Sequence, residues 1–380
     1  MSVTGSPVGF ETVSEEAVET PELSLDDISV FRERVDERLH EFVTGRAGRL
    51  DELGPGLDPL LDAAHDSLRG GKRLRAAFCY WGWRAAGGSP GTEDDDRIVT
   101  AAASVELLHA SALVHDDVMD HSDRRRGQPA AHRQFSELHR AGRRPGDAEE
   151  FGFGSAILLG DLLLSWTDEM LRTSGFGVDQ VMAALRCLDS MRTEVAAGQF
   201  LDLVAQNSTD NSVPQAMRVL RYKSAKYTVE RPLHMGAALG GADSRLMTSL
   251  TSYGLPLGEA FQLRDDVLGV FGDPEVTGKP AGDDLREGKR TVLMALATER
   301  ATAGQAEVIG RLFGSPRLDD RGVRELRDVV ERTGARTAVE QLIHQLTRAA
   351  TTALDQAPID DPGIKTALLD LATAATSRTS

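Results

Sequence analysis

Two long segments of the chain, 99–119 and 154–173, are apolar on most of their faces. A helix that is hydrophobic all round must be covered on every side, as the central helices of a large bundle are. Strand-like alternation is scarce, and clusters of Gly, Pro, Ser and Asp separate the helical stretches. The sequence therefore predicts an all-α fold. An amphipathic segment precedes the two, with apolar residues at the spacing of one helical face: Ile28, Phe31, Val35, Leu39 and Phe42.

The beginning of the chain differs from the rest in composition. Residues 1–23 are rich in Ser, Thr, Glu and Pro and have little periodicity, which predicts a disordered acidic tail. This stretch lacks the basic start of a signal peptide. We expect a single helical domain over 24–380, because no linker divides it and 41% hydrophobic residues can build a large core.

Charge and cysteine content exclude several classes of protein. A net charge of −16 argues against a nonspecific nucleic-acid binder. Cys79 and Cys187 are too few for a disulfide framework, and their hydrophobic neighbours predict reduced core thiols. No uninterrupted apolar run approaches the roughly 18 residues of a membrane span. We therefore expect a cytoplasmic protein that binds no nucleic acid and has no membrane span.

An aspartate pair lies at the end of the first apolar segment. Asp116 and Asp120 are four residues apart, so a helix presents both carboxylates on one face. Like charges in apolar surroundings need a counter-cation, and Mg²⁺ prefers carboxylate oxygens together with phosphate oxygens. Asp117 points about 100° away from Asp116 and is expected to support the site from behind. The pattern predicts a divalent metal that holds a polyanion.

A second pair, Asp265 and Asp266, also stands in an apolar helical context. Adjacent carboxylates are costly to bury unless something cationic compensates them. We therefore expect the two pairs to form two walls of one cavity. The pairs differ in one respect, because Gly269 stands where the first pair has Asp120.

Arginines follow the first pair directly. Residues 124–126 are all Arg, and Gly127 then lets the chain turn sharply. Guanidinium groups match phosphate oxygens bidentately, so this run suits a polyanion that the metal binds.

Further cationic candidates lie upstream. Lys72 and Arg75 are expected on one helical face after the flexible pair Gly70–Gly71. His109 precedes Asp116 by two helical turns and therefore shares its face. A histidine in an apolar helix is either a satisfied core residue or, as this register suggests, part of the site.

Four motifs together resemble the trans-prenyl diphosphate synthases of the polyprenyl synthetase family, and most of all a geranylgeranyl diphosphate synthase. They are GGKRLR (70–75), HDDVMDHSDRRRG (115–127), FQLRDD (261–266) and GKPAGDDLREGKRT (278–291), in the order that the family has them. Such a match is specific, although each part alone is not. The family fold is a single helical bundle around a central cavity. Supporting pieces are Gly160-Asp161, Gly198-Gln199-x-x-Asp202 and Tyr222-Lys223-Ser224-Ala225-Lys226.

The resemblance implies a mechanism. About three Mg²⁺ ions would bridge the diphosphate of an allylic substrate to Asp116, Asp120 and Asp265, with Asp117 and Asp266 behind them. Neutralising this leaving group lets the C–O bond ionise to an allylic carbocation in a dry pocket. Further side chains are implied to hold the same diphosphate: Arg125, Lys223, Ser224, Gln262 and Lys279.

The second substrate implied is isopentenyl diphosphate. Lys72, Arg75, His109 and Arg126 would anchor it, and its double bond would attack the cation before a proton is lost to the departing pyrophosphate. No protein general base is required, which agrees with the lack of a Ser-His-Asp or Cys-His arrangement. The resemblance also implies a homodimer.

The chain departs from the family pattern at three positions. Gly269 replaces a third Asp, Ala76 replaces a Pro, and Ser224 replaces a Thr while keeping its hydroxyl. If Asp265 supplies the direct ligand, the third carboxylate is the most dispensable, and Asp273 could compensate for it. We therefore expect restoring Gly269→Asp to change little.

Product length depends on the helix that carries Asp116. Ala112 and Ser111 lie about one turn deeper, roughly 6–7.5 Å, and Leu108 lies a further turn down. Relatives that stop at C15 commonly carry a bulky aromatic at this level. Two small side chains leave the tunnel open, so we expect a product of C20 or longer unless a neighbouring helix supplies the floor.

Three other functions remain open from the sequence. A type I terpene cyclase also ionises allylic diphosphates with Asp-rich sites, but it does not need a second diphosphate site such as Lys72, Arg75 and Arg126. A farnesyl synthase would differ only in product length. A non-catalytic regulatory subunit would be expected to lose metal carboxylates, and here only position 269 departs.

Overall fold

The structure is a computed structural model and describes residues 25–208, 211–272 and 282–376. The predicted acidic tail, 1–23, and the start of the predicted domain at Ser24 lie outside this part of the chain. The described residues form helices throughout, apart from one short hairpin, so the predicted all-α fold is confirmed. Its first half contains α1 (Leu25–Thr44), α2 (Ala47–Asp51), α3 (Asp58–Leu68), α4 (Leu74–Ala85), α5 (Glu93–Met119), β1 (Arg124–Arg125), β2 (Gln128–Pro129), α6 (Ala131–Ala141), α7 (Ala148–Arg172) and α8 (Val178–Gln206).

The second half begins with a π-helix between two α-helices. Long helices then alternate with short ones up to the C-terminal end of the described chain. The elements are α9 (Val213–Val219), η1 (Leu220–Glu230), α10 (Arg231–Leu239), α11 (Ser244–Phe271), α13 (Asp283–Glu287), α14 (Val292–Glu299), α15 (Ala303–Leu312), α16 (Asp320–Arg332), α17 (Ala335–Asp355) and α18 (Pro362–Thr376).

Helix α5 is the central element, as its composition predicts, and it packs along α7. Among the described residues it alone is long and apolar enough, by length and composition, to cross a membrane. Most of the apolar window is buried by neighbouring helices, 72% of it, and a core helix has this composition for the same reason.

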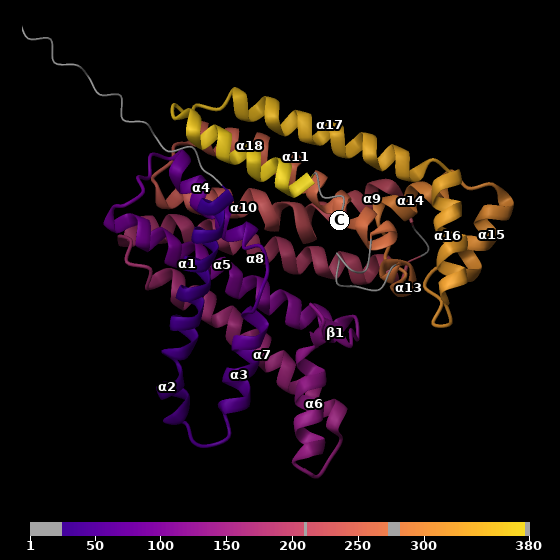
Figure 1. The fold of residues 1–380 in the computed structure, drawn as a ribbon, viewed down its shortest axis with the longest axis horizontal. Helices are drawn as coiled ribbons and strands as arrows, with labels where there is room; N and C mark the ends of the chain where they lie inside the picture. The colour runs from indigo at the N-terminus through magenta and orange to yellow at the C-terminus, as the bar shows by residue number, and fades with distance from the viewer. Residues whose placement is uncertain (1–24, 209–210, 273–281, 377–380) are drawn as a thin grey trace, which may run out of the picture.

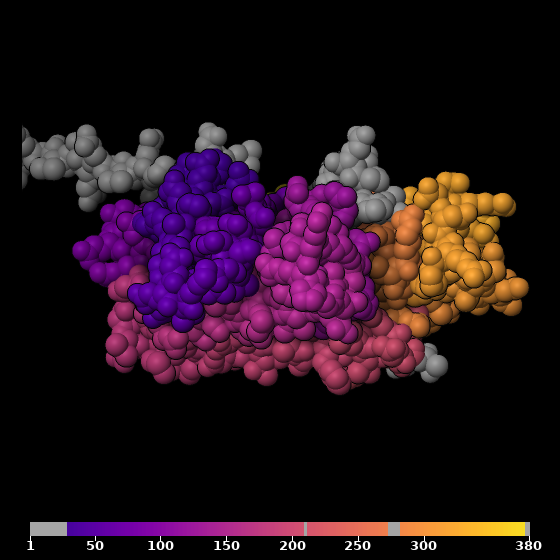
Figure 2. Space-filling view, turned by 90° about the horizontal axis from the view of Figure 1, so that it is seen from below, coloured from indigo at the N-terminus to yellow at the C-terminus, as the bar shows by residue number. Residues whose placement is uncertain are grey.

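The remaining helices cover α5 and α7 unevenly. Helices α17 and α18 lie on one side of the bundle next to α11, whereas α2, α3 and α6 project on the other side (Figure 1). Seen from that other side, α1–α3 and α6 form adjacent lobes, and α15 and α16 stand at one end (Figure 2).

The apolar core consists of two clusters that meet along α11 and η1. Tyr253 and Leu257 of α11 belong to the larger cluster, whereas Leu263 and Val267 of the same helix belong to the smaller one. The larger cluster is built mainly from α1, α3–α8, α10 and α18, and the smaller one from α14–α17. Functional groups on α11 and η1 therefore stand where the two clusters join.

The π-helix η1 was not predicted from the sequence. A π-helix is rare and often occurs at functional sites, since its wider turn changes which side chains share a face. Glycines on both neighbouring helices allow a close approach: a Cβ at Gly258 of α11 would lie 2.4 Å from the carbonyl oxygen of Ala225. The backbone of η1 is thus held between α8 and α11.

Candidate active site

A cavity of about 620 Å³ lies between α5, α8, η1 and α11. The start of α4 and the segment from α13 to α14 complete its wall. Both acidic motifs reach this one cavity, although they are far apart in the sequence. Its charged lining consists of Asp116, Asp202, Asp265, Asp266, Asp283 and Asp284 together with Lys72, Arg75, Arg125, Lys223, Lys289 and Arg290.

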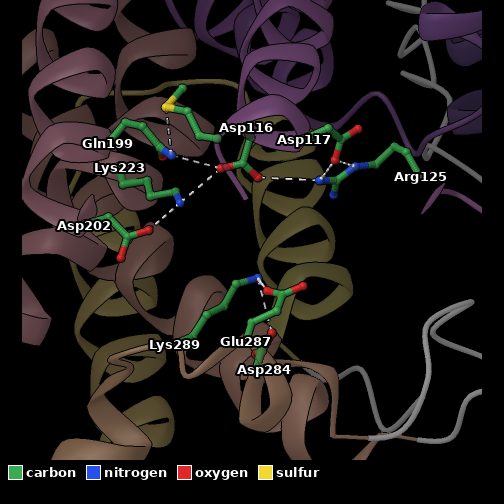
Figure 3. A network of polar contacts seen from close by, with 10 residues as sticks. Asp116, Asp117, Arg125, Gln199, Asp202, Lys223, Asp284, Glu287 and Lys289 are labelled. Carbon is green, nitrogen blue, oxygen red and sulfur yellow. Dashed lines mark hydrogen bonds and ion pairs between the residues drawn. The ribbon is translucent and has the colours of Figure 1, made fainter. Parts of the chain in front are cut away.

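Asp116 is the centre of a polar network in the last turn of α5 (Figure 3). Its Oδ1 accepts hydrogen bonds from Gln199 Nε2 at 3.1 Å and Lys223 Nζ at 3.3 Å, and its Oδ2 lies 3.5 Å from Arg125. Burial opposes ionisation of this carboxyl, but Lys223 and Arg125 outweigh it and lower its pKa. Asp116 is therefore a charged carboxylate facing the cavity.

Asp117 lies behind this network, buried and not lining the cavity. It pairs with Arg125, whose Nε donates to Asp117 Oδ1 at 2.9 Å. Arg125 belongs to the β1–β2 hairpin, which turns through Arg126 and Gly127, both with positive φ. The buried pair thus fixes the hairpin so that the Arg125 guanidinium reaches the cavity.

Asp120 follows α5 as its C-terminal cap, and its backbone N–H donates to the carbonyl of Asp116 at 2.8 Å. Its side chain is not part of the cavity wall. Burial and the charge of Asp116 raise the pKa of Asp120 to about 6. Asp120 therefore lies near Asp116, and the repulsion between the two negative charges makes Asp120 harder to ionise.

Lys223 reaches the cavity from η1. Its ammonium lies 2.7 Å from Asp202 Oδ2 of α8 as well as near Asp116. Burial lowers the pKa of Lys223, but the two carboxylates outweigh this effect and raise it. Ser224, Tyr227 and Thr228 of the same π-helix also line the cavity.

The second acidic pair stands on α11. Asp265 lines the cavity, and Asp266 is almost completely buried, with Gln262 Nε2 donating to its Oδ1 at 2.9 Å. Burial, together with Asp284 and Asp265, raises the pKa of Asp266 to about 8 even though the Gln262 bond opposes this. Asp265 and Asp266 therefore differ in environment.

Sequence reasoning missed a lysine after α13. Lys289 extends toward Asp116 and pairs with Glu287 at 2.9 Å and Asp284 at 3.3 Å (Figure 3). Burial opposes its charge, but these carboxylates raise its pKa well above the usual value. The signal was present, because Lys289 stands in the motif 278–291 that carries the family resemblance. Lys279 of that motif, and Asp273, lie outside the described residues.

The upstream basic group lies at the other end of the cavity. Lys72 and Arg75 both line it, but α4 begins only at Leu74, so Lys72 stands in the preceding loop. This corrects the expectation that the two share a helical face. Arg75 donates to Thr228 Oγ1 at 3.0 Å. Arg126 does not line the cavity and instead donates to the carbonyl of Arg69 at 2.7 Å.

His109 lines the cavity two turns before Asp116, as its register predicts. Its Nδ1 lies 3.2 Å from the hydroxyl of Tyr227. Burial, and then the charge of Arg75, lowers its pKa well below the usual value. A neutral imidazole therefore faces this end of the cavity.

The three residues predicted to set product length are placed differently from one another. Ala112 lines the cavity, together with its neighbour Leu113. Leu108 and Ser111 are each 3% exposed and are buried in helix packing away from the cavity wall. Of the predicted set, Ala112 alone faces the cavity.

Position 269 also lies on the cavity wall. A Cβ built on Gly269 would stand 1.9 Å from Oδ2 of Asp284, so no side chain fits without displacing that carboxylate. The expectation that Gly269→Asp changes little rested on a dispensable third carboxylate, whereas the structure shows that the added side chain would collide with Asp284.

Comparison of the chain with known proteins identifies its family. The sequence model of the polyprenyl synthetase family matches residues 58–330, which is well over half of the chain. The chain belongs to the polyprenyl synthetase family. It is accordingly an enzyme, a prenyltransferase of isoprenoid biosynthesis.

Proteins similar to this chain are named for different products. A crystal structure of geranylgeranyl pyrophosphate synthase from Corynebacterium glutamicum, complexed with isoprenyl diphosphate and magnesium, is 40% identical, has a TM-score of 0.88, and covers 93% of this chain and 99% of its own. A farnesyl diphosphate synthase of Mycobacterium tuberculosis is 31% identical over 81% of this chain and 75% of its own length. A geranylfarnesyl diphosphate synthase of Aeropyrum pernix is 32% identical over 77% and 85%. These relatives therefore share the family of this chain but are named for products of three different lengths.

Proposed function

We propose that this enzyme condenses isopentenyl diphosphate with an allylic diphosphate, head to tail, to give a trans-prenyl diphosphate of C20 or longer. The observation that carries the proposal is one cavity with two acidic motifs and two separate basic groups. Lys223, Arg125 and Lys289 surround the acidic motifs, whereas Lys72 and Arg75 stand apart from them beside His109. A reaction that joins two diphosphates needs two such groups.

The donor set suits magnesium. Carboxylate oxygens from α5 and α11 face the cavity, and hard oxygen donors with room for phosphate and water are what Mg²⁺ requires. Asp116 and Asp265, which line the cavity, and Asp120, which lies beside Asp116 but outside the cavity wall, would hold about three ions, with Asp117 and Asp266 supporting them from behind. When bound, the ions would neutralise the diphosphate and so assist cleavage of its C–O bond.

The chain's own cations would hold the allylic diphosphate. Lys223, Arg125 and Lys289 already sit at carboxylates, so a diphosphate entering with metal would replace those contacts by phosphate oxygens. Ser224 and Gln262 line the same region, and Lys279 is added by similarity. Apolar side chains such as Leu113 and Phe261 line the cavity beside these groups and would exclude water from a carbocation.

Isopentenyl diphosphate would occupy the other basic end. Lys72 and Arg75 line it, and the neutral His109 could donate a hydrogen bond without adding charge. Arg126 contacts the Gly70–Gly71 turn before Lys72 and would act there.

Product analysis tests the proposal. Purified enzyme with Mg²⁺, labelled isopentenyl diphosphate and dimethylallyl, geranyl or farnesyl diphosphate should give geranylgeranyl diphosphate or longer products on chromatography. A cyclised hydrocarbon would instead support a terpene cyclase, and accumulation of farnesyl diphosphate would support a shorter-chain synthase. Absence of turnover with every starter would support a regulatory subunit.

A homodimer is the assembly we propose. Large apolar side chains near the acidic end of α5 remain uncovered, among them Leu158 of α7 at 64% exposure and Phe200 of α8 at 65%. Leu158→Arg should shift the mass measured by light scattering from dimer to monomer. The control Val178→Arg, at the exposed other end of α8, should leave the dimer intact. Unpaired Cys79 and Cys187 support a cytoplasmic location.

A further inference from the structure

The second acidic motif is incomplete along its own helix. Asp265 and position 269 are one turn apart on α11 and share a face, as Asp116 and Asp120 do at the end of α5. Position 269 is Gly, so α11 itself supplies no carboxylate there.

Another helix brings a carboxylate to the same place. The Oδ2, Cγ and Oδ1 atoms of Asp284 lie 1.9, 2.5 and 3.1 Å from the point where a Cβ of residue 269 would stand. The whole carboxylate of Asp284 thus occupies the position where a side chain at 269 would begin. Asp284 lines the same cavity as Asp265.

Helix α13 holds Asp284 in this position. Leu285, the next residue, is fully buried, and its carbonyl accepts a hydrogen bond from Gly314 N at 3.0 Å. Arg286 pairs with Asp320 of α16 at 2.8 Å. Lys289 Nζ lies 3.3 Å from Asp284 Oδ1 and so pairs with the carboxylate that faces Gly269. The absence of a side chain at Gly269 is what allows α13 this approach.

We propose that Asp284 supplies, from α13, the third carboxylate of the metal site formed by Asp265 and Asp266. The lack of a side chain at Gly269 leaves the space that this carboxylate occupies. The inference rests on the proposed function, because it assigns a role in that metal site. The motif on α11 is then complete in space although it is incomplete in sequence.

Metal binding tests this assignment independently of turnover. Mn²⁺ would be titrated into the full-length protein with inorganic pyrophosphate present, and bound Mn²⁺ would be followed by electron paramagnetic resonance. Asp284→Asn should weaken Mn²⁺ binding by about 10- to 100-fold, the range for residues that support metal ligands. Circular dichroism melting would show that the variant is folded.

Three further variants separate the metal role from a structural one. Glu287→Gln removes the other carboxylate partner of Lys289 but is not part of the cavity wall, so it should bind Mn²⁺ like the parent protein. Gly269→Asp alone should weaken binding, because its side chain collides with Asp284. The double variant Gly269→Asp/Asp284→Ala moves the carboxylate back to α11 and should recover most of the affinity.

The outcomes distinguish this inference from the proposed function. A folded Asp284→Asn with parental Mn²⁺ affinity, or a double variant no better than Asp284→Asn, would overturn the inference while the parent protein still elongates substrate. Failure of the parent protein both to bind Mn²⁺ with pyrophosphate and to elongate any allylic substrate would overturn both.

Discussion

Gly198 of α8 lies directly against the backbone of Lys223 in η1: a Cβ at position 198 would stand 2.3 Å from the amide nitrogen of Lys223. The lysine that pairs with Asp116 is therefore placed by a contact between two main chains, with no side chain between them.

The change Gly198→Ala would force α8 and η1 apart and shift Lys223 from Asp116. A displacement of about 1 Å at a catalytic group can cost roughly 100-fold in rate, so we expect a loss of that order in kcat. Steady-state kinetics would measure it. Gly310→Ala on α15 is the matched control, because nothing lies within 4 Å of its added Cβ. An equally active Gly198→Ala would show that the contact does not position Lys223.

Removing a carboxylate of the proposed metal sites should lower kcat far more than removing an exposed carboxylate elsewhere. Asp116→Ala, Asp120→Ala and Asp265→Ala should each lower kcat by roughly 1,000-fold, the upper range for removing one charge-stabilising group. Glu93→Ala, whose side chain is 85% exposed at the other end of α5, is a control that should keep most activity. Rates with saturating substrates and Mg²⁺ would decide. Substantial turnover by Asp265→Ala would remove α11 from the proposed metal site.

Glu106 should affect the binding of isopentenyl diphosphate at the basic end of the cavity that carries Lys72 and Arg75. It is buried, and its Oε1 accepts a hydrogen bond from the backbone N–H of Ala76 at 3.2 Å while its Oε2 pairs with Arg73 at 3.4 Å. Both contacts fix the loop and first turn that carry Lys72 and Arg75. A proline at position 76 would lack the donor that Glu106 binds.

We expect Glu106→Gln to raise KM for isopentenyl diphosphate about tenfold with a smaller change for the allylic substrate. Asp36→Asn removes the other, more exposed carboxylate partner of Arg73 and should have a smaller effect. Separate titrations of the two substrates would measure both constants. Equal increases for the two substrates would argue that Glu106 supports the fold rather than this end of the cavity.

Two buried histidines should lower stability in mild acid, against the opposite effect of Asp120 and Asp266, whose pKa values are raised. Burial lowers the pKa of His109 and His234 from the ordinary 6.5 in the folded protein. Between the folded and unfolded pKa values of each histidine the unfolded chain binds more protons, so the contribution of these two groups to the free energy of unfolding decreases as pH falls below 6.5. Melting temperatures from about pH 7.5 down to about pH 5.5 would measure the slope.

His234 allows the contribution of one group to be separated. Its Nε2 lies 3.0 Å from Thr251 Oγ1, outside the cavity. His234→Gln cannot take up a proton, so between about pH 7.5 and about pH 5.5 its melting temperature should fall less, or rise more, than that of the parent protein. Identical slopes would mean that His234 does not titrate differently in the folded and unfolded chains.

Product length should respond to Ala112 more than to Ser111. Ala112 faces the cavity, so Ala112→Phe would place a ring beside the growing chain and shorten the product toward C15. Ser111 is buried in packing, so Ser111→Phe should mainly lower stability, because overpacking a core costs about 1–3 kcal/mol. Chromatography of the products would separate the two cases. Unchanged products from Ala112→Phe would place the floor on another helix.

Much of the architecture could be read from the sequence, because it depends on local periodicity. The apolar segments became α5 and α7, and the spacing of Asp116 and His109 put both on one face of a single helix. Arg125 reaches the cavity because its distance from Asp116 along the chain is short. These relationships lie within one or two elements, where helix geometry decides the outcome.

The rest depends on how separate elements meet. The π-helical turn of η1 follows from packing between α8 and α11, and no propensity within Leu220–Glu230 signals it. Lys72 lies before α4 because Arg73 takes a positive φ and is held by Glu106, which is far away in sequence. Asp284 opposite Gly269 likewise required the tertiary structure.

The junction of the two apolar clusters along α11 has a consequence for cooperativity. Because α11 and η1 contribute side chains to both clusters, neither cluster can lose its packing without disturbing the other. The cavity opens at this junction, so a ligand bound there contacts elements from both halves. Substrate binding should therefore stabilise the two halves together against unfolding, and heat should melt the ligand-bound bundle as a single unit.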